Sequence, residues 1–517
     1  MNGAEALTRA LLAGGVNTCF ANPGTSEMHF VAALDRFEEM RPVLCLFEGV
    51  ATGAADGYGR MADKPAATLM HLGFGLSGGL ANLHNARKAR SPVVNIVGEH
   101  ASWHLESGSA LVSDIEGLAV PMSDWVHTSR DASSVARDAS AAITAARARG
   151  GQVATLILPA DTAWSAGGQP PDAPAPPPAL QTVDPGAVGA AVNALRSGEP
   201  ALLLLGGRAL RQGALEMAGR IAAATGARLA TPYGIGRLER GAGRVPVERL
   251  PALIDPARKA FAGIRNVILA GAEHPAAMFA YPDKPRAMED PGARFMSLAE
   301  DSACAPEALR ALCGAIGANA IDPALEPREA PLAPTGHLTP DAVLQAVTFA
   351  MPDNAIIVDE SISAGRNFFP LSRGAVPHDY LQLPAGALGN GIPSALGASI
   401  ACPDRPVINL EGDGSAMYTL QGLWTQAREK ANVLTIIFSN RRYNILDAEM
   451  KGVGISEKAG QRARRMLSLD RPDISWVDLA RGFGVEAARV TEIGPLIDMV
   501  KGCATRKGPF LVEAVLP

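Results

Sequence analysis

The sequence predicts an α/β protein of three domains, each built on a parallel β-sheet. Short apolar runs typical of strands alternate with helical stretches along the whole chain of 517 residues, a pattern typical of parallel sheets with crossover helices. Two proline-rich stretches, residues 166–185 and 321–337, can form neither a helix nor an inner strand and are predicted to be linkers. We therefore expect domains over residues 1–165, 186–320 and 338–517.

The composition limits the class of protein. The chain has 47% hydrophobic and 19% charged residues, ordinary for a globular protein with several cores. Its net charge of −5 gives no reason to expect binding to nucleic acid or to an anionic membrane. No apolar run approaches the ~18 residues of a membrane span, and the N-terminus lacks a signal-peptide core. The six cysteines show no Cys-x-x-Cys spacing, so we expect a cytoplasmic protein without a zinc site or disulfides.

The first domain contains two stretches with candidate functional groups. Residues 22–27, Asn-Pro-Gly-Thr-Ser-Glu, form a tight loop that opens a helix, with Thr25 or Ser26 as its cap, although a plain turn explains them equally. Glu48 ends an apolar strand and precedes a helix of small residues. A carboxylate there is costly to bury unless it is hydrogen-bonded, and the alternative is a glutamate that interacts with the helix dipole.

A third candidate in this domain is His71. It ends the apolar strand 67–70 and precedes a glycine-rich stretch, residues 73–79. The glycines suggest close approach of a ligand, and a histidine there could donate or accept a proton near pH 7. The alternative is a strand-end histidine with only a structural role.

The last domain contains a glycine-rich loop at residues 386–391, Gly-Ala-Leu-Gly-Asn-Gly, before a helix. Its one large side chain, Leu388, lies 25 positions before Asp413. Such a loop could support an apolar cofactor ring with Leu388, or it could be an ordinary strand-to-helix connection.

Residues 406–444 predict a strand, a glycine turn, a helix and a second strand. The first strand ends in Gly412-Asp413-Gly414, Ser415 opens a helix that continues to about Lys430, and the second strand ends just before Asn440. Asp413 and Asn440 should therefore meet at the edge where parallel sheets bind ligands. Their oxygens suit Mg²⁺, and the two glycines and the helix N-terminus suit a phosphate. These residues predict a magnesium–diphosphate site.

These stretches together resemble the thiamine diphosphate-dependent 2-oxo acid decarboxylase and acetolactate synthase superfamily over nearly the whole chain. The resemblance rests on four stretches that occur in order: residues 22–27, residues 47–60 (Phe-Glu-Gly-Val-Ala-Thr-Gly-Ala-Ala-Asp-Gly-Tyr-Gly-Arg), residues 386–399, and Gly-Asp-Gly-Ser with Asn440 27 positions after Asp413. It implies a pyrimidine-binding, a central and a diphosphate-binding domain.

The resemblance also implies roles for individual residues. Glu48 would hydrogen-bond the aminopyrimidine ring and favour its imino tautomer, which takes the proton from thiazolium C2; the resulting ylide and enamine carry the chemistry. Leu388 would bend the cofactor, and Asp413, Asn440 and the main-chain carbonyl of Arg442 would hold Mg²⁺. The other implied cofactor contacts are Gly386, Gly412, Gly414, Ser415 and Tyr443. Glu48 of one subunit would meet Asp413 of another, so a homodimer is the minimum and a homotetramer is usual.

Within the superfamily the chain resembles the benzoylformate decarboxylases most. Thr25 falls on a substrate-contacting serine and His71 on the first catalytic histidine of that family. Leu111 and Val112 fall on its apolar pocket wall, to which Ile445 would add. The second catalytic histidine has no clear match: His274 lies several positions early, and alignment places Met278 there.

The acetolactate synthases differ from this chain at three places. They have Phe-Gln-Glu where this chain has Ala110-Leu111-Val112, and a tryptophan where this chain has Glu449. Glu449 is either a polar group in the pocket or a solvated helix residue. The central domain lacks the flavin-loop patterns of those enzymes, so we expect no functional FAD.

The resulting interpretation is a non-oxidative decarboxylase or carboligase that depends on thiamine diphosphate and Mg²⁺ and acts on a 2-oxo acid. The first alternative is an acetolactate synthase-type catalytic subunit that joins two 2-oxo acids. The second is an inactive protein of the same fold with a binding or regulatory role, which the presence of both Glu48 and Asp413 disfavours.

Overall fold

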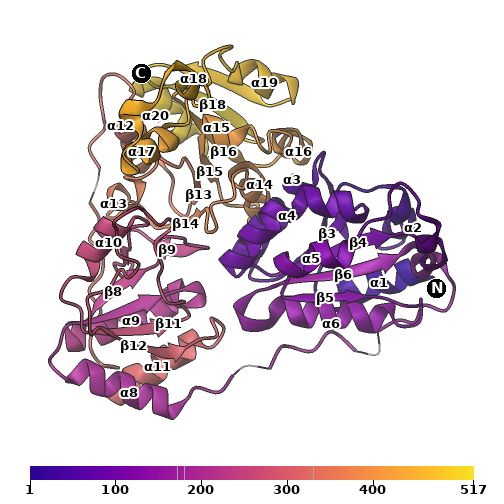
Figure 1. Ribbon diagram of the computed structural model, residues 1–517, viewed down its shortest axis with the longest axis horizontal. Coiled ribbons are helices and arrows are strands. Elements are labelled where there is room, and N and C mark those ends of the chain that lie inside the picture. Colours follow the sequence, from indigo (N-terminus) through magenta and orange to yellow (C-terminus); the bar gives the residue numbers. More distant parts are fainter. Residues whose placement is uncertain (172, 180, 330) are drawn as a thin grey trace.

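The computed structural model describes residues 1–171, 173–179, 181–329 and 331–517, whose strands form three sheets (Figure 1). The first sheet belongs to an N-terminal domain, the second to a central domain and the third to a C-terminal domain. In these described ranges no helix is long and apolar enough to cross a membrane.

The two predicted linkers contain residues 172, 180 and 330, and that part of the prediction lies outside the described residues. The described residues of both stretches form no helix or strand except Pro185, the first residue of α8 (Pro185–Arg196). The absence of regular structure agrees with their proline content, since proline lacks the backbone N–H that helices and sheets use.

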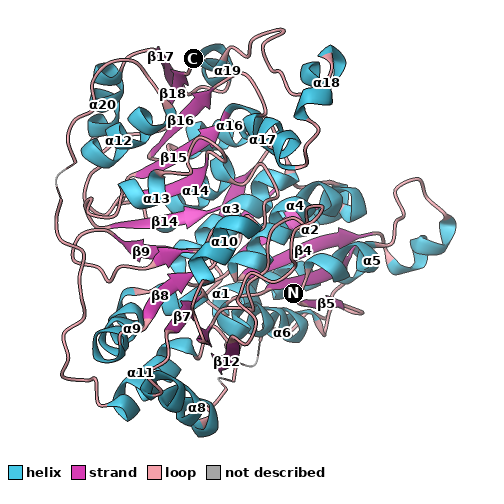
Figure 2. Ribbon diagram, turned by 60° about the vertical axis from the view of Figure 1, so that its left-hand side comes forward, coloured by secondary structure: helices cyan, strands magenta, loops and turns pink. Residues whose placement is uncertain are grey.

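The N-terminal sheet has six parallel strands in the order β2-β1-β3-β4-β6-β5, with helices on both faces (Figure 2). Alternate residues of a strand enter different cores: Met70 packs beneath α3 and α4, and Leu69 beneath α1 and α6. Burial on both faces explains why the strands are continuous apolar runs. The elements are β1 (Thr18–Ala21), β2 (Arg41–Leu44), β3 (Ala66–Met70), β4 (Val93–Glu99), β5 (Trp125–Thr128), β6 (Val153–Pro159), α1 (Gly3–Ala13), α2 (Met28–Leu34), α3 (Glu48–Ala62), α4 (Leu72–Ala89), α5 (Ile115–Ala119), α6 (Val135–Arg147) and α7 (Ala160–Trp164).

The central sheet has five parallel strands in the order β10-β8-β7-β11-β12. One core lies on each face, with Leu203 and Leu205 of β7 on one side and Leu202 and Leu204 on the other. The elements are β7 (Ala201–Leu205), β8 (Arg228–Thr231), β10 (Glu248–Arg249), β11 (Asn266–Ala270), β12 (Arg294–Ala299), α9 (Gln212–Thr225), α10 (Ile254–Phe261) and α11 (Ala305–Ile316).

The C-terminal sheet has seven strands in the order β17-β18-β16-β15-β13-β14-β9. Six are parallel, as predicted, but the edge strand β9 (Leu238–Arg240) comes from the central domain and pairs antiparallel with β14. The sequence of β9 is too short to show a periodic pattern, so only the tertiary structure reveals it (Figure 2). The other elements are β13 (Ile356–Glu360), β14 (His378–Gln382), β15 (Val407–Gly412), β16 (Val433–Ser439), β17 (Glu486–Val490), β18 (Phe510–Val515), α12 (Pro340–Ala350), α13 (Phe368–Leu371), α14 (Gly391–Ala401), α15 (Asp413–Ala416), α16 (Gly422–Glu429), α17 (Asn444–Gly452), α18 (Gln461–Arg465), α19 (Trp476–Gly482) and α20 (Ile493–Gly502).

The single helix predicted from Ser415 to about Lys430 is wrong, because α15 ends at Ala416 and α16 begins at Gly422. The intervening turn packs against the glycine-rich loop 386–391: a Cβ on Gly389 would lie 2.7 Å from Tyr418 Cβ. This tertiary contact overrides the local propensity of these residues to form one continuous helix.

Helices α3 and α14 join the N-terminal and C-terminal domains, and they lie side by side in Figure 1. Their backbones approach closely at glycines of both helices. A Cβ on Gly57 would lie 2.1 Å from the Ser394 carbonyl oxygen, and one on Gly397 would lie 1.9 Å from the Ala54 carbonyl oxygen. Gly57 and Gly397 therefore serve interdomain packing, since no larger side chain fits there.

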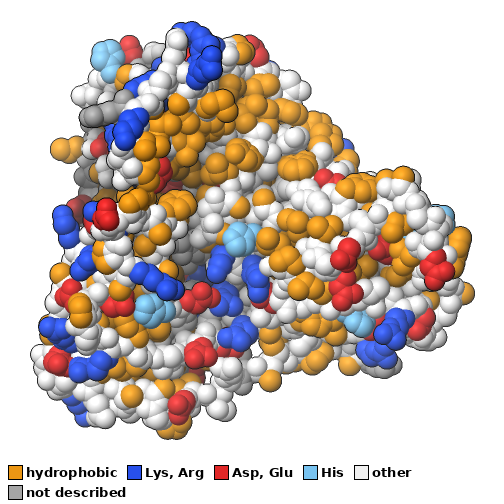
Figure 3. Space-filling view, in the orientation of Figure 1, with side chains coloured by type: hydrophobic (Ala, Val, Ile, Leu, Met, Phe, Trp, Pro, Cys, Tyr) orange, Lys and Arg blue, Asp and Glu red, His pale blue; other side chains and the backbone are white. Residues whose placement is uncertain are grey.

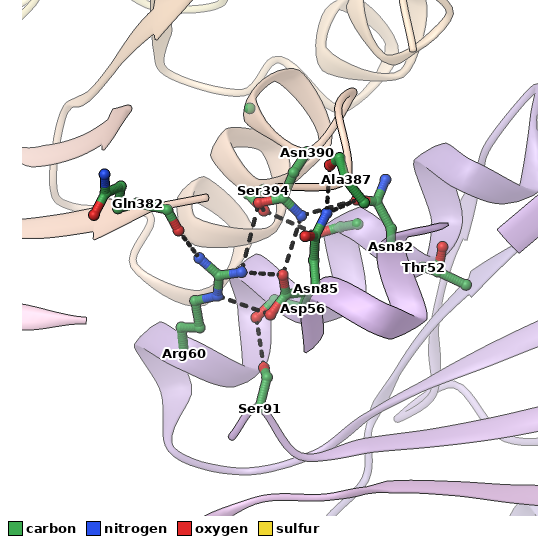
Figure 4. A network of polar contacts seen from close by, with 12 residues as sticks. Thr52, Asp56, Arg60, Asn82, Asn85, Ser91, Gln382, Ala387, Asn390 and Ser394 are labelled. Atoms are coloured by element: carbon green, nitrogen blue, oxygen red, sulfur yellow. Dashed lines mark hydrogen bonds and ion pairs between the residues drawn. The ribbon is translucent and has the colours of Figure 1, made fainter. Parts of the chain in front are cut away.

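A buried polar network crosses the same helix pair (Figure 4). Arg60 Nε donates to Asp56 Oδ1 at 2.8 Å within α3, and Arg60 Nη1 donates to the Gln382 carbonyl at 2.8 Å. Asn390 Nδ2 donates to Asp56 Oδ2 at 3.1 Å. Because the buried charges of Asp56 and Arg60 are paired and hydrogen-bonded, the network holds loop 386–391 against the N-terminal domain.

Replacement of Gly57 by alanine should destabilise the protein. The added Cβ meets backbone atoms of Ser394, so α3 and α14 have to move apart, at a cost of about 1–3 kcal/mol. Thermal unfolding at fixed protein concentration measures the effect as a lower midpoint. Gly189→Ala in α8 is the matched control, because a Cβ there has no neighbour within 4 Å and alanine favours the helix. Equal midpoints for the two variants would contradict the role of Gly57 in packing.

Candidate active site

The carboxyl ends of β15 and β16 bring Asp413 and Asn440 together. These parallel strands are neighbours in register, with Gly412 opposite Phe438. Asp413 Oδ2 accepts the backbone N–H of Arg441 at 2.6 Å, and Asn440 Oδ1 accepts that of Arg442 at 3.0 Å. The two residues therefore lie side by side at the edge where parallel α/β sheets bind ligands.

Asp413 is buried and has no cationic partner among the residues that the structure describes. The residue is 4% exposed, and burial raises the pKa of its carboxyl above the usual range, against the hydrogen bonds from backbone N–H groups. In the described part of the chain the carboxylate accepts N–H groups of Gly414 and Arg441 but forms no ion pair. A buried carboxylate beside an amide oxygen fits Mg²⁺, which takes hard oxygen ligands and completes its shell with phosphate and water.

The residues that flank this pair also converge. Arg441 adopts the left-handed conformation, with φ of 58°, and its N–H reaches Asp413. The Tyr443 ring lies on Gly414, where a Cβ would be 2.4 Å from its Cε1 atom. Gly414 thus makes room for the side chain of Tyr443. Burial raises the pKa of the Tyr443 hydroxyl. Ser415 is buried at the start of α15, whereas Arg442 is exposed.

The glycine-rich loop is anchored by a carboxylate that the sequence analysis missed. Glu360, at the end of β13, accepts the N–H of Gly389 at 2.7 Å and also that of Gly391. Leu388 is half-buried in this loop, and Gly386 is exposed with a positive φ of 77°. The Asn85 amide donates to the Ala387 carbonyl at 2.7 Å, so the backbone around Leu388 is held from both sides.

Glu360 lies opposite a second buried carboxylate, Glu411 of β15. Burial raises the pKa of Glu360 to about 7, and burial together with the neighbouring Glu360 raises the pKa of Glu411 well above its usual range. Two carboxyl groups this close cannot both ionise easily, so the pair holds a proton. Both residues end apolar runs in the sequence, which was the only signal that could have identified them.

Glu48 is the first residue of α3, because β2 ends earlier than predicted, at Leu44. Its Oε1 accepts the Asn22 amide at 3.0 Å, and the residue is half-buried. A Cβ on Gly78 would lie 3.0 Å from Glu48 Oε2, so this glycine of α4 makes room for the carboxylate rather than for a ligand. Glu48 is therefore an oriented carboxylate with access to a hydrogen-bond donor.

His71, the residue before α4, is paired with Glu27. Its Nδ1 lies 2.9 Å from Glu27 Oε2 and 3.0 Å from Ser26 Oγ. The cap prediction for Thr25 or Ser26 is wrong: the cap position is Gly24, Ser26 contacts His71, and Thr25 is exposed. Sequence analysis missed Glu27 as a partner because the two residues are 44 positions apart.

The predicted pocket residues Leu111 and Val112 lie in the loop before α5. This loop approaches the first turn of α4, since a Cβ on Gly73 would lie 2.1 Å from Ser113 Oγ. Leu111 is exposed and Val112 is half-buried, and they directly precede Ser113 in the chain. Gly73, which Ser113 approaches, lies in the first turn of α4, two residues after His71. The loop and His71 therefore belong to one region of the N-terminal domain.

Ile445 and Glu449 lie on α17, close to Asn440 in the chain. Glu449 is half-buried and accepts the Tyr281 hydroxyl at 2.8 Å, which links α17 to the central domain. Burial and this carboxylate raise the pKa of Tyr281 to about 12. His274 instead lies against Phe295, with ring centroids 4.1 Å apart, and Met278 is exposed.

The candidate residues form two sets, one around Glu48 and His71 and one around Asp413 and Asn440. Among the described residues, no hydrogen bond or ion pair joins a candidate residue of one set directly to one of the other. Asn82 Nδ2 connects their surroundings, because it donates to the Gly49 carbonyl at 2.8 Å and to the Gly389 carbonyl at 2.9 Å. One set can hold a metal-bound diphosphate, and the other can exchange protons with a ring or a substrate.

Comparison with known proteins identifies the N-terminal and C-terminal domains. Residues 1–118 match the model of the thiamine pyrophosphate enzyme N-terminal TPP binding domain, and residues 367–514 match that of the C-terminal TPP binding domain. The chain is 47% identical over 517 residues to a protein of Mycobacterium tuberculosis named "Putative acetolactate synthase large subunit IlvX", covering 100% of this chain and 99% of that protein.

Two decarboxylases are similar over nearly the full length. The benzoylformate decarboxylase of Pseudomonas aeruginosa is 29% identical over 538 residues, with 96% of each chain covered. The structure of the thiamine diphosphate-dependent 4-hydroxybenzoylformate decarboxylase of Rhodococcus jostii RHA1 matches with a TM-score of 0.84 and 25% identity, covering 100% of this chain and 99% of that chain. The chain therefore belongs to the thiamine pyrophosphate enzyme family, as a decarboxylase-like or acetolactate synthase-like enzyme.

Proposed function

We propose that this enzyme uses thiamine diphosphate and Mg²⁺ to remove CO₂ from a 2-oxo acid without oxidation. The product is an aldehyde, or the remaining acyl group is joined to an acceptor carbonyl. The observation that carries the proposal is the neighbouring pair Asp413 and Asn440 at the strand edge, with the Asp413 carboxylate buried and without a cation among the described residues.

The residues of the C-terminal domain position the cofactor. Bound thiamine diphosphate supplies the carbanion chemistry that decarboxylation of a 2-oxo acid needs. Asp413, Asn440 and the Arg442 carbonyl would hold Mg²⁺, which would neutralise the charge of the diphosphate. Leu388 presents an apolar side chain to the cofactor from a loop that Glu360 and Asn85 keep in place. Gly412, Gly414 and Ser415 place the start of α15 beside the diphosphate.

The residues of the N-terminal domain handle protons. Glu48, oriented by Asn22, donates and accepts a proton at the cofactor's pyrimidine ring. His71 uses Nδ1 to contact Glu27 and Ser26, which leaves Nε2 for the substrate. A carboxylate on Nδ1 fixes the orientation and the tautomer of the ring, as in other general acid–base histidines. Thr25 contacts the substrate from the loop beside Ser26.

We propose a homodimer as the smallest active form and a homotetramer as the usual assembly. Figure 3 shows hydrophobic side chains gathered where α14, α15 and α16 lie and continuing onto α3 and α4. Exposed large side chains at these ends of the two domains include Leu46, Phe74, Met417 and Tyr418. A second copy that covers them would bring Glu48 to Asp413 of the partner subunit and complete a site that neither domain forms alone.

The second candidate function is acetolactate synthesis. It is favoured by the name of the relative that is 47% identical over the whole chain. This reaction needs pyruvate as the acceptor, and the pocket disfavours a second carboxylate if Glu449 faces it in ionised form. Product analysis separates the two functions.

Glu48→Gln should retain thiamine diphosphate and lose most activity. The amide keeps the shape but cannot accept or release a proton at the pyrimidine ring, and such roles contribute about 10²–10⁴-fold. Turnover and exchange of the cofactor C2 proton, followed by NMR, measure the loss. Glu116→Gln, an exposed glutamate of α5, is the control. Near wild-type turnover together with normal exchange would remove Glu48 from the mechanism.

Asp413→Ala should abolish binding of thiamine diphosphate that depends on Mg²⁺. Asp413 is the buried carboxylate beside Asn440, with Oδ1 on the Gly414 N–H and Oδ2 on the Arg441 N–H, so its loss removes the central metal ligand. Calorimetric titration with and without Mg²⁺ measures affinity, and cofactor should no longer raise the thermal midpoint. Asp404→Ala, at an exposed turn, is the control and should behave as wild type. Unchanged affinity in Asp413→Ala would show that Asp413 is not a ligand.

An aryl or branched 2-oxo acid should outcompete pyruvate in kcat/KM. We propose that Leu111, Val112 and Ile445 contribute apolar side chains to the substrate site, where each buried CH₂ would contribute about 0.8 kcal/mol. Glu449→Trp should raise any formation of acetolactate from pyruvate, because it removes the carboxylate that Tyr281 holds. CO₂ release and product mass for pyruvate, 2-oxobutyrate, branched 2-oxo acids and phenylglyoxylate test both statements. Tyr281→Phe separates loss of the hydrogen bond from loss of the charge.

The predicted preference for an aryl or branched 2-oxo acid is wrong if the wild-type enzyme converts pyruvate fastest and acetolactate is the main product. The acetolactate synthase function then replaces the decarboxylase function for this chain.

A further inference from the structure

A cavity of about 720 Å³ lies between the central and C-terminal domains, away from the candidate active site. Its walls come from the C-terminal half of α9, the segment 240–249 that ends in β10, residues 324 and 326, and the region around α13. The cavity thus lies beside the edge strand of the central sheet. Parallel sheets usually bind nucleotides at the carboxyl ends of inner strands, a different place.

Small residues make this space. Helix α9 presents Gly219, Ala222 and Ala223 to the cavity, its C-cap residue Gly226 adds to this wall, and no side chain of these residues extends beyond Cβ. The remaining wall is mostly apolar and includes Leu229, Val245, Val247 and Phe369. The volume lies within the range of about 300–1,000 Å³ that is typical of sites for small organic molecules.

Arg240 lines the cavity with a buried positive charge. The residue is 8% exposed, its Nη2 donates to the Phe369 carbonyl at 2.6 Å, and its guanidinium lies 3.7 Å from the centre of the Phe369 ring. Its Nη1 is buried and has no hydrogen-bond partner, and the side chain forms no ion pair in the described part of the chain. Burial lowers the pKa of this guanidinium to about 9, which reflects the cost of leaving the charge uncompensated.

Arg249 adds a second positive charge to the same wall. Its guanidinium lies 4.8 Å from the centre of the Phe369 ring, and Nη1 donates to the Tyr380 hydroxyl at 3.1 Å. It too forms no ion pair with a described residue. The other charged residues of the lining are neutralised: Arg373 pairs with Glu326, and Glu248 with Arg228.

We propose that this cavity binds a small organic anion, with a phosphate or carboxylate group at Arg240 and Arg249 and an apolar body along α9. Two guanidinium groups without carboxylate partners supply charge-assisted hydrogen bonds to the anion. The alanines and Phe369 supply apolar contact to the body. The ligand is distinct from the 2-oxo acid at the active site, and the proposal does not rest on the proposed function.

The test measures binding to the full-length protein saturated with thiamine diphosphate and Mg²⁺. Calorimetric titrations with phenyl phosphate and phenylacetate distinguish the two anions, and inorganic phosphate and benzyl alcohol test the charge and the apolar body separately. Saturable binding of either aromatic anion, at least tenfold tighter than both partial probes, is expected. No saturable binding of either anion, or equal binding of inorganic phosphate, would overturn the proposal.

Four variants locate the binding. Arg240→Met and Arg249→Met should each raise Kd at least tenfold, whereas Arg258→Met, at an exposed position of α10 that does not line the cavity, should change it less than twofold. Because a buried arginine variant can fail to fold, Ala223→Phe fills the space from an exposed position of α9 with both arginines intact. It should weaken binding at least tenfold.

Ala224→Phe is the matched control, since Ala224 is exposed on the same helix and does not line the cavity. Its Kd should equal that of wild type. Wild-type affinity in Ala223→Phe would place the anion elsewhere and refute the site.

Discussion

The buried ion pair of Asp56 and Arg60 holds the two cofactor-binding domains of the chain together. Both side chains are almost completely buried on α3, so their charges are tolerable only because each is paired and hydrogen-bonded. Asn390 and the Gln382 carbonyl complete the pairing from the C-terminal domain. Helix α14 and the loop that precedes it are thereby placed against α3, whose first residue is Glu48. The position of Leu388 relative to Glu48 follows from this interface.

The candidate metal site depends on a different constraint, the register of two parallel strands. Because β15 and β16 end side by side, the residues that follow them meet even though they are far apart in the chain. Backbone N–H groups then orient the Asp413 carboxylate without neutralising it. The same sheet places Glu360 opposite Glu411, and Glu360 uses its oxygens to hold the glycine-rich loop. Carboxylates at the ends of two neighbouring strands, β13 and β15, thus have different roles, because each meets different partners.

The central domain is connected to this edge by side chains as well as by strand β9. Arg249 donates to the Tyr380 hydroxyl, and that hydroxyl donates to Asp359 Oδ2 at 2.7 Å. Asp359 is the residue before Glu360, so two hydrogen bonds and one peptide link connect the cavity wall to the carboxylate that holds the loop around Leu388. On the other side of the domain, Tyr281 contacts Glu449 of α17. The central domain therefore touches two segments that flank the candidate active site.

The sequence by itself determined the fold class, the order of the strands along the chain and the place of Asp413, Asn440 and Glu48 at the ends of elements. These features are local, because the spacing of apolar residues, glycine turns and proline-rich stretches each depend on a few neighbouring residues. The family resemblance adds the order in which the motifs occur. Only the tertiary structure decided which side chains meet. The contact of His71 with Glu27, the pair of Glu360 and Glu411, the transfer of β9 to the last sheet and the use of Gly57 and Gly397 for helix packing all join residues distant in the chain. Such contacts depend on strand register and on how the domains pack together. Neither can be predicted from the periodicity of the sequence.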